Sequence, residues 1–272
     1  MHPNQDPPEG WPAPRRTAVR VLSAAFLILI TLGIALVAVA AVVTGDVLQI
    51  VVFGLSAILG LHITGIAISG LRSPRPVAEV RVIGETDLGE KGLAFPYARQ
   101  PYYWLSVTLA IVALLSAGFA VTMAAQGTAT SWVLAVIGGA FAAFVGWFLV
   151  VLLRLAPGTM VLTPTGIYHR SLVLEHFVPW DAVVDLQAQQ TANPWITVKA
   201  LPTTETRERR HTGRLGAFEG QALPFVVART YWLGANALPA YRALKHYFEH
   251  PGERSKLANI DQVTHGRDLH KG

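Results

Sequence analysis

The chain has no cysteine and little charge. With no cysteine among 272 residues, disulfide bonds and thiolate metal sites are excluded. Only 14% of the residues are charged, while 52% are hydrophobic. Asp, Glu, Lys and Arg are absent from residues 21–45, 47–71 and 100–153. Uncharged apolar stretches of about 18 residues or more can cross the hydrocarbon core of a bilayer as a helix. The sequence therefore predicts an integral membrane protein.

The longest uncharged stretch divides at a polar, turn-prone segment, Gln126 to Ser131. This division predicts four transmembrane helices, at residues 19–43, 47–71, 102–125 and 132–153. None of them contains proline, so each backbone can satisfy its own hydrogen bonds in lipid. The first span is longer than the roughly 7–15 apolar residues of a signal-peptide core, and we interpret it as an anchor.

The distribution of basic residues predicts the orientation. All 22 Lys and Arg residues lie at the N-terminal end, in the connection at 72–101 or after the last span. The two other connections carry only Asp46 and neutral residues. Basic residues stay on the cytoplasmic side of a membrane. We therefore expect a multi-pass protein of the plasma membrane with both termini in the cytoplasm, and disordered tails at 1–18 and 259–272.

Two features inside the spans are candidates for contacts. Gly138, Ala142 and Gly146 recur every four residues, and small residues at this spacing let helices approach closely. They predict packing either within the four-helix bundle or between two copies of the chain. His62 is the candidate ionisable group inside the membrane; it serves either as a relay or ligand, or as a hydrogen-bonding group towards a neighbouring helix.

After the last span, the pattern changes to short strands separated by turns. Residues 159–174 read as a hairpin with its turn at 163–166, and further strand signals lie at 177–186, 195–198 and 225–227. The apolar period then changes to that of a helix, over residues 237–250, with Asn236 as a candidate cap. The sequence thus predicts a small antiparallel β-barrel or sandwich at 155–258, closed by a C-terminal helix.

This region resembles the bacterial pleckstrin-homology-like (PH-like) domains. The resemblance lies in three segments: Leu162 to Arg170, Val178 to Val183 and the helix from Asn236 to His250. The resemblance covers about 155–258, and the whole arrangement is similar to membrane proteins of high-GC Gram-positive bacteria that lack an assigned function. It implies a seven-stranded, partly open barrel plugged by a helix, acting as a binding or scaffolding module. The segment 202–222 is polar and long for such a barrel. The connection at 72–101 is a flexible link, or it docks on this domain, or it adds a strand to it.

One run of basic residues is a candidate contact surface. It holds four arginines within eight residues: Arg207, Arg209, Arg210 and Arg214. As a loop near the inner leaflet it would attract anionic lipid at about 1 kcal/mol per basic group. The alternatives are an acidic partner or an ordinary solvated loop. No nucleic-acid partner is expected, because interleaved aromatic residues and a recognition helix are missing.

No enzyme motif is present in the sequence. Five residues that could serve a metal or acid–base site are close in sequence but match no ligand spacing, and we interpret them as surface or turn residues: His169, Glu175, His176, Asp181 and Asp185. No catalytic residue, cofactor or metal site is predicted. We expect a non-catalytic scaffold, regulator or accessory subunit, with another membrane protein or a second copy as its partner. A component of a transport system and a membrane-associated enzyme are the alternatives.

Overall fold

The structure is a computed structural model that describes residues 18–71, 82–86, 89–189, 194–212 and 225–259. The chain divides into two compact units. The helical unit comprises Pro14–Ser73 and Gln100–Arg154, and the sheet unit comprises Met1–Ala13, Pro74–Arg99 and Leu155–Gly272. The tails predicted to be disordered, 1–18 and 259–272, lie almost entirely outside the described residues.

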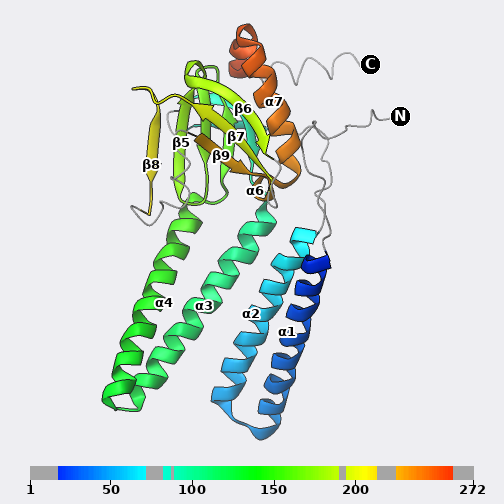
Figure 1. Cartoon of the computed structure of the whole chain (residues 1–272). Helices are drawn as coiled ribbons and strands as arrows, with labels where there is room; N and C mark the ends of the chain where they lie inside the picture. Colours follow the sequence, from blue (N-terminus) through cyan, green and yellow to red (C-terminus); the bar gives the residue numbers. More distant parts are fainter. Residues whose placement is uncertain (1–17, 72–81, 87–88, 190–193, 213–224, 260–272) are drawn as a thin grey trace. The chain divides into compact units, whose positions relative to one another are not determined.

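Among the residues that the structure describes, four helices are long and apolar enough to cross a membrane. They are α1 (Ala18–Thr44), α2 (Val47–Leu71), α3 (Arg99–Ala125) and α4 (Ala129–Leu155) (Figure 1). Large apolar side chains cover their outer surface; Leu36, for example, is 70% exposed and Val43 is 84% exposed. Exposing such a large apolar surface to water is unfavourable, whereas contact with the lipid hydrocarbon is not. These helices bear out the prediction of a multi-pass membrane protein.

Short capped turns join the helices in pairs. In the first turn, Gly45 adopts a φ of 73°, and Asp46 Oδ1 accepts a hydrogen bond from the Gln49 backbone N–H at 3.0 Å. In the second turn, the Thr128 N–H donates to the Ser131 hydroxyl at 3.0 Å, and the Ser131 N–H donates to the Thr128 hydroxyl at 3.2 Å. These reciprocal bonds cap α4, which therefore begins at Ala129 rather than at the predicted residue 132.

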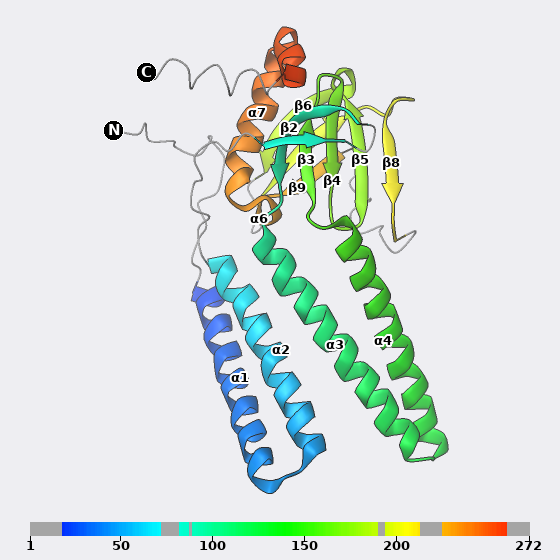
Figure 2. The same cartoon turned by 180° about the vertical axis from the view of Figure 1, so that it is seen from behind.

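The strands of the other unit form two antiparallel sheets. The large sheet has the order β1-β2-β3-β4-β5-β8, of which Figure 2 shows β2 to β8 from behind. Its strands are β1 (Val82–Glu85), β2 (Lys91–Pro96), β3 (Thr159–Leu162), β4 (Gly166–Arg170), β5 (Leu174–Pro179) and β8 (Arg207–Arg210). The small sheet has the order β6-β7-β9, with β6 (Val183–Gln189), β7 (Trp195–Ala200) and β9 (Phe225–Arg229).

Strands therefore occur at each of the segments that the sequence indicated after the last span, but the described strands do not close into a barrel. The short 3₁₀ helix η1 (Trp180–Ala182) leads from β5 in the large sheet to β6 in the small one. The Trp180 indole N–H donates to the Thr163 carbonyl at 2.8 Å, which anchors this crossing to the turn between β3 and β4.

The connection before α3 contributes two strands to the large sheet. β2 pairs with β3 in a register that places Leu93 opposite Leu162 and Phe95 opposite Met160. A Cβ on Gly92 would lie 2.2 Å from the Leu162 carbonyl oxygen, so only glycine permits this approach. The sequence left open whether 72–101 docks on the C-terminal domain. The structure places β1 and β2 in the sheet of that domain, which extends the unit beyond 155–258.

The C-terminal segment is helical as expected. It comprises α6 (Thr230–Leu233), η3 (Gly234–Asn236), α7 (Ala237–Glu249) and η4 (Pro251–Asn259). Ala240 and Leu244 of α7 are fully buried. Asn236 makes no side-chain cap, contrary to the prediction, because its backbone is already helical. Its amide instead donates to the Pro96 carbonyl at 2.7 Å and so ties the helix to the end of β2.

Candidate functional site

The predicted arginine loop is in large part a strand. Residues Arg207–Arg210 form β8, which pairs with β5 so that Arg207 lies opposite Phe177 and Arg209 opposite Glu175. The loop prediction was wrong for these residues because a run of charged residues has a weak strand propensity, and pairing with a neighbouring strand overrides it. Arg214 lies outside the described residues.

The alternation of a strand separates these arginines. Arg207 and Arg209 lie on one face of the sheet, and Glu208 and Arg210 lie on the other. The Arg207 guanidinium lies 4.7 Å from the centroid of the Phe177 ring, a cation–π geometry. The Glu208 carboxylate pairs with Arg210 and raises the pKa of that guanidinium. The described arginines therefore do not form one continuous basic patch.

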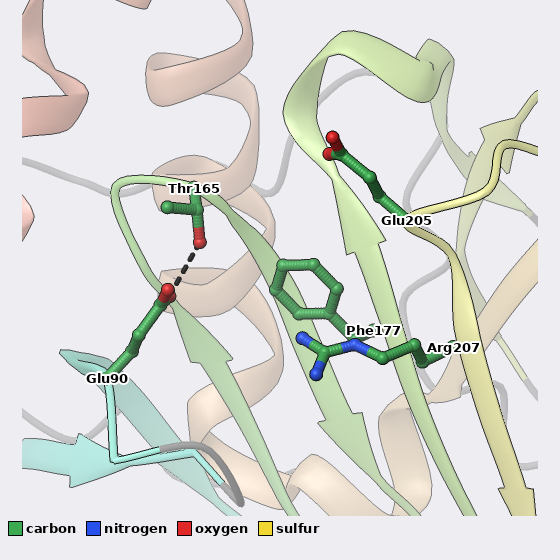
Figure 3. Close-up of a pocket in the computed structure, with 5 residues that line it drawn as sticks. All are labelled: Glu90, Thr165, Phe177, Glu205 and Arg207. Atoms are coloured by element: carbon green, nitrogen blue, oxygen red, sulfur yellow. Dashed lines mark hydrogen bonds between the residues drawn. The ribbon is translucent and has the colours of Figure 1, made fainter.

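A cleft of about 290 Å³ lies on the Arg207 face and is lined by Glu90, Thr165, Phe177, Glu205 and Arg207 (Figure 3). The Thr165 hydroxyl donates to Glu90 Oε2 at 2.6 Å, which links the segment before β2 to the turn between β3 and β4. Figure 3 shows Arg207 along the Phe177 ring and the Glu205 carboxylate directed away from it. Arg207 thus lines this cleft together with two acidic residues, Glu90 and Glu205.

A row of polar side chains crosses the opposite face. His169 on β4 lies opposite His176 on β5, which in turn lies opposite Glu208 on β8. Both histidines are buried, at 3% exposure each. His169 Nε2 is hydrogen-bonded to the Tyr97 hydroxyl at 2.6 Å. The prediction of surface or turn positions was wrong for both histidines, since each lies inside a strand of the sheet.

The environment of the two histidines keeps them uncharged at neutral pH. Burial, with a smaller contribution from neighbouring His176, lowers the pKa of His169 to about 3. Burial also lowers the pKa of His176, and the nearby Glu208 carboxylate offsets part of that effect. A neutral imidazole has one nitrogen that donates and one that accepts a hydrogen bond.

A second cleft, of about 430 Å³, opens beside His176. Most of its wall is apolar and comes from β5 and from the chain after β7, with a smaller number of polar groups. The lining residues are His176, Val178, Ala200, Leu201, Pro202, Thr203, Thr206 and Glu208. His176 Nε2 is buried and has no hydrogen-bond partner among the described residues. The volume lies within the roughly 300–1,000 Å³ typical of small-molecule sites.

The other members of the predicted polar group lie elsewhere. Glu175 is on the face opposite to His176, with its Oε1 3.3 Å from His211 Nε2. Asp181 is fully exposed, and Asp185 Oδ2 lies 3.2 Å from Lys199 Nζ. In the part of the chain that the structure describes, no three His, Cys, Asp or Glu side chains are placed to hold a metal ion. The two histidines are thus the only pair from this group that the sheet brings together.

The small residues of α4 differ in their surroundings. A Cβ on Gly138 would lie 3.0 Å from the Phe119 ring and 3.4 Å from Ala120 Cβ, so α4 contacts α3 at this position. A Cβ on Gly146 would meet nothing within 4 Å, and Ala142 is half-buried. The structure therefore places Gly138 in a contact within the bundle and leaves Gly146 open.

His62 is buried within the helical unit at 7% exposure. Its Nδ1–H donates a hydrogen bond to the Ile58 carbonyl of the same helix at 2.8 Å. The imidazole ring meets the edge of the Trp104 ring of α3, with centroids 5.1 Å apart. The described hydrogen bond therefore runs within α2, and the contact with the neighbouring helix is aromatic.

Comparison with protein-family models, with curated proteins and with solved structures finds no match to this chain.

Proposed function

We propose that this chain is a multi-pass plasma-membrane protein with a cytoplasmic, PH-like sheet domain that binds a membrane-protein partner, a second copy or anionic lipid. In this proposal the chain is a non-catalytic scaffold, regulator or accessory subunit of a membrane complex. The sheet domain supplies the binding surface, and the four helices of the other unit anchor it.

The observation that supports this proposal is the insertion of a helical hairpin between two paired strands. β2 ends at Pro96, two residues before α3 begins, and β3 begins at Thr159, three residues after α4 ends. β2 and β3 are nevertheless neighbours in one sheet. Since two or three residues cannot cross a bilayer of about 30 Å, the sheet and these two helix ends belong to the same side. A sheet domain that is joined to two membrane helices through such short connections is well suited to act at the membrane surface.

The distribution of basic residues supports a cytoplasmic location for the sheet domain. Arg99 begins α3, and Arg154 lies in the last turn of α4, whereas the turns at the other ends of the helices carry no basic residue. Basic residues beside spans mark the cytoplasmic face. The strand series followed by α7, which buries Ala240 and Leu244, supports the PH-like assignment, and the strands β1 and β2 are additions to that plan.

Two exposed basic side chains of the sheet domain provide the contact surface in this proposal. Arg207 and Arg209 are exposed on one face of β8, while Arg210 is paired with Glu208. Exposed guanidinium groups of this kind pair with carboxylates and phosphates. An acidic partner segment and the phosphates of anionic lipid both meet that requirement.

The test uses single cysteines, since the chain has none of its own. Cysteine replaces Asp46, Thr128 or Arg209 one at a time in the full-length protein. We expect a membrane-impermeant thiol reagent to label the first two in intact cells, and to label Arg209→Cys only after permeabilisation. In isolated membranes, a photo-crosslinker on Arg209→Cys should then capture a membrane protein, a second copy or anionic lipid.

Lys245 provides the matched control for the crosslink, because its side chain is 56% exposed on α7, away from β8. A crosslinker on Lys245→Cys should not yield the same adduct. Labelling of Arg209→Cys in intact cells would contradict the orientation. The same adducts at positions 209 and 245 would show that β8 is not the contact surface.

A further inference from the structure

The cleft beside His176 has the composition of a small-molecule site rather than of a hydrated surface depression. Its apolar wall is formed by Val178, Ala200, Leu201 and Pro202. Leu201 is 61% exposed, an uncommon state for a large apolar side chain in the sheet unit. An apolar wall with a few convergent polar groups is the usual form of a site for an organic ligand.

One of the side chains that line this cleft has a buried polar atom without a partner. The His176 side chain is 97% buried, and its Nε2 makes no hydrogen bond to any described residue. Leaving a buried polar atom unbonded is costly, so such an atom indicates a group that a ligand or water satisfies. The adjacent histidine does not share this feature, because its Nε2 is bonded to Tyr97.

The other polar groups of the cleft are already engaged. The Glu208 carboxylate pairs with Arg210, and the hydroxyls of Thr203 and Thr206 are hydrogen-bonded to each other at 3.0 Å. The imidazole is uncharged at neutral pH, since burial lowers the pKa of His176. An anionic ligand would therefore find no positive charge among the lining residues, and a cationic ligand would have to compete with Arg210 for the Glu208 carboxylate. Either ligand would also have to lose its hydration at the apolar wall.

We propose that the cleft beside His176 binds an uncharged, mostly apolar small molecule that carries a hydroxyl group and hydrogen-bonds to His176 Nε2. The proposal rests on the sheet domain being a binding module and names the ligand class of that module. It does not involve β8's Arg207 or Arg209, which lie on the opposite face of the sheet.

The test measures binding of naphthol, an uncharged aromatic alcohol, to the full-length protein in lipid nanodiscs. Saturation-transfer NMR reports the binding, and empty nanodiscs correct for partition into lipid. We expect binding to weaken at least tenfold in Leu201→Trp, because the larger ring fills the cleft from its rim. Val184→Trp is the matched control, since Val184 is 57% exposed on β6 and does not line the cleft. This control should bind naphthol as the wild type does.

Two further comparisons test the hydrogen bond and the charge. His176→Phe removes the nitrogen and should weaken binding about tenfold, the size expected for one hydrogen bond, whereas His176→Gln keeps a hydrogen-bonding group and should bind more tightly than His176→Phe. Naphthalene sulfonate, of similar shape but anionic, should bind at least tenfold more weakly than naphthol.

Equal binding by the wild type and Leu201→Trp would overturn the site, and equal binding of the alcohol and the sulfonate would overturn the ligand class. Leu201 lies on the exposed rim, so its replacement tests the site even if the buried His176 variants fail to fold. These results are independent of the cysteine labelling and crosslinking. Crosslinking through position 209 without naphthol binding would support the proposed function and contradict the ligand site proposed here.

Discussion

At the scale of single residues, the buried imidazoles of His169 and His176 make the stability of the sheet unit depend on pH. His169 and His176 occupy the core-facing side of adjacent strands, where a positive charge would lose its hydration. Tyr97 and the neighbouring Glu208 are the other titratable groups of this row. The fold therefore depends on both rings remaining neutral.

Acid should destabilise the sheet unit through His169. Its pKa falls from 6.5 in the unfolded chain to about 3 in the folded one, so the folded state binds fewer protons between these values. The stabilisation is complete above about 6.5 and is lost as the pH falls towards 3. From His169 alone we expect the free energy of unfolding to be about 2 kcal/mol lower at about pH 5 than at about pH 7.5.

Chemical unfolding of the full-length protein, followed by tryptophan fluorescence at the two pH values, measures this effect. His169→Gln should reduce the difference by the contribution of His169 and leave that of His176, whose pKa burial also lowers. His250→Gln, at the exposed end of α7, is the control and should retain it. An unchanged pH dependence in His169→Gln would show that other groups are responsible.

At the scale of secondary-structure elements, glycines determine how closely the membrane helices approach one another. A Cβ on Gly60 of α2 would lie 2.7 Å from the Thr31 hydroxyl of α1, and a Cβ on Gly65 would lie 2.7 Å from the Trp104 ring of α3. The hydroxyls of Thr31 and Thr64 are 3.3 Å apart, which adds a polar contact between α1 and α2. Two of the glycines on α2 thus mark two different helix contacts.

Gly65→Ala should destabilise the helical unit by roughly 1–3 kcal/mol, because its methyl group overlaps the rigid Trp104 ring. Gly54→Ala is the control on the same helix, since a Cβ there meets nothing within 4 Å. Alanine favours a helix over glycine by about 1 kcal/mol, so the control should be neutral or stabilising. Unfolding in SDS, followed by circular dichroism, compares the two variants. Equal stability would show that Gly65 does not mark a close contact.

Some elements could be predicted from local sequence features, and others could not. The spans follow from the absence of charge, and β3, β4 and α7 follow from turn residues and apolar period, all of which are local properties. β8 could not be predicted in this way, because Arg207 to Arg210 form a strand only through pairing with β5. The cleft beside His176 was missed for the same reason: its wall combines β5 with residues after β7.

At the scale of the whole molecule, the described residues of the sheet unit come from two stretches of chain separated by the α3–α4 hairpin. Three hydrogen bonds hold the first stretch in place where β2 ends. The Tyr97 N–H donates to Gly158 at 2.8 Å, the Ala98 N–H donates to Trp232 at 2.7 Å, and the Asn236 amide donates to Pro96 at 2.7 Å. The second stretch alone would leave β3 as an exposed edge.

We expect residues 155–259 alone to aggregate, because the apolar edge at β3 would lack its neighbour. A chain in which residues 82–98 precede 155–259, with a short glycine–serine linker in place of α3 and α4, should be soluble and unfold cooperatively. Size-exclusion chromatography and circular dichroism measure the difference.

Gly92→Val in the joined chain is the control, since a Cβ there collides with the Leu162 carbonyl. This variant should behave like residues 155–259 alone. Cooperative unfolding of the shorter chain would mean that β2 is dispensable for the fold.

The sequence by itself determined the four membrane helices and the change to strands after the last one. Both predictions rest on features of contiguous sequence. These features are the absence of charge over the thickness of a bilayer and the turn residues between β-prone runs. Only the tertiary structure decided that β2 pairs with β3 across an intervening hairpin, that an arginine-rich segment is a strand, and that His169 faces His176. Such contacts depend on register between distant segments, which is specified by the burial of a whole face and not by the propensity of any one residue.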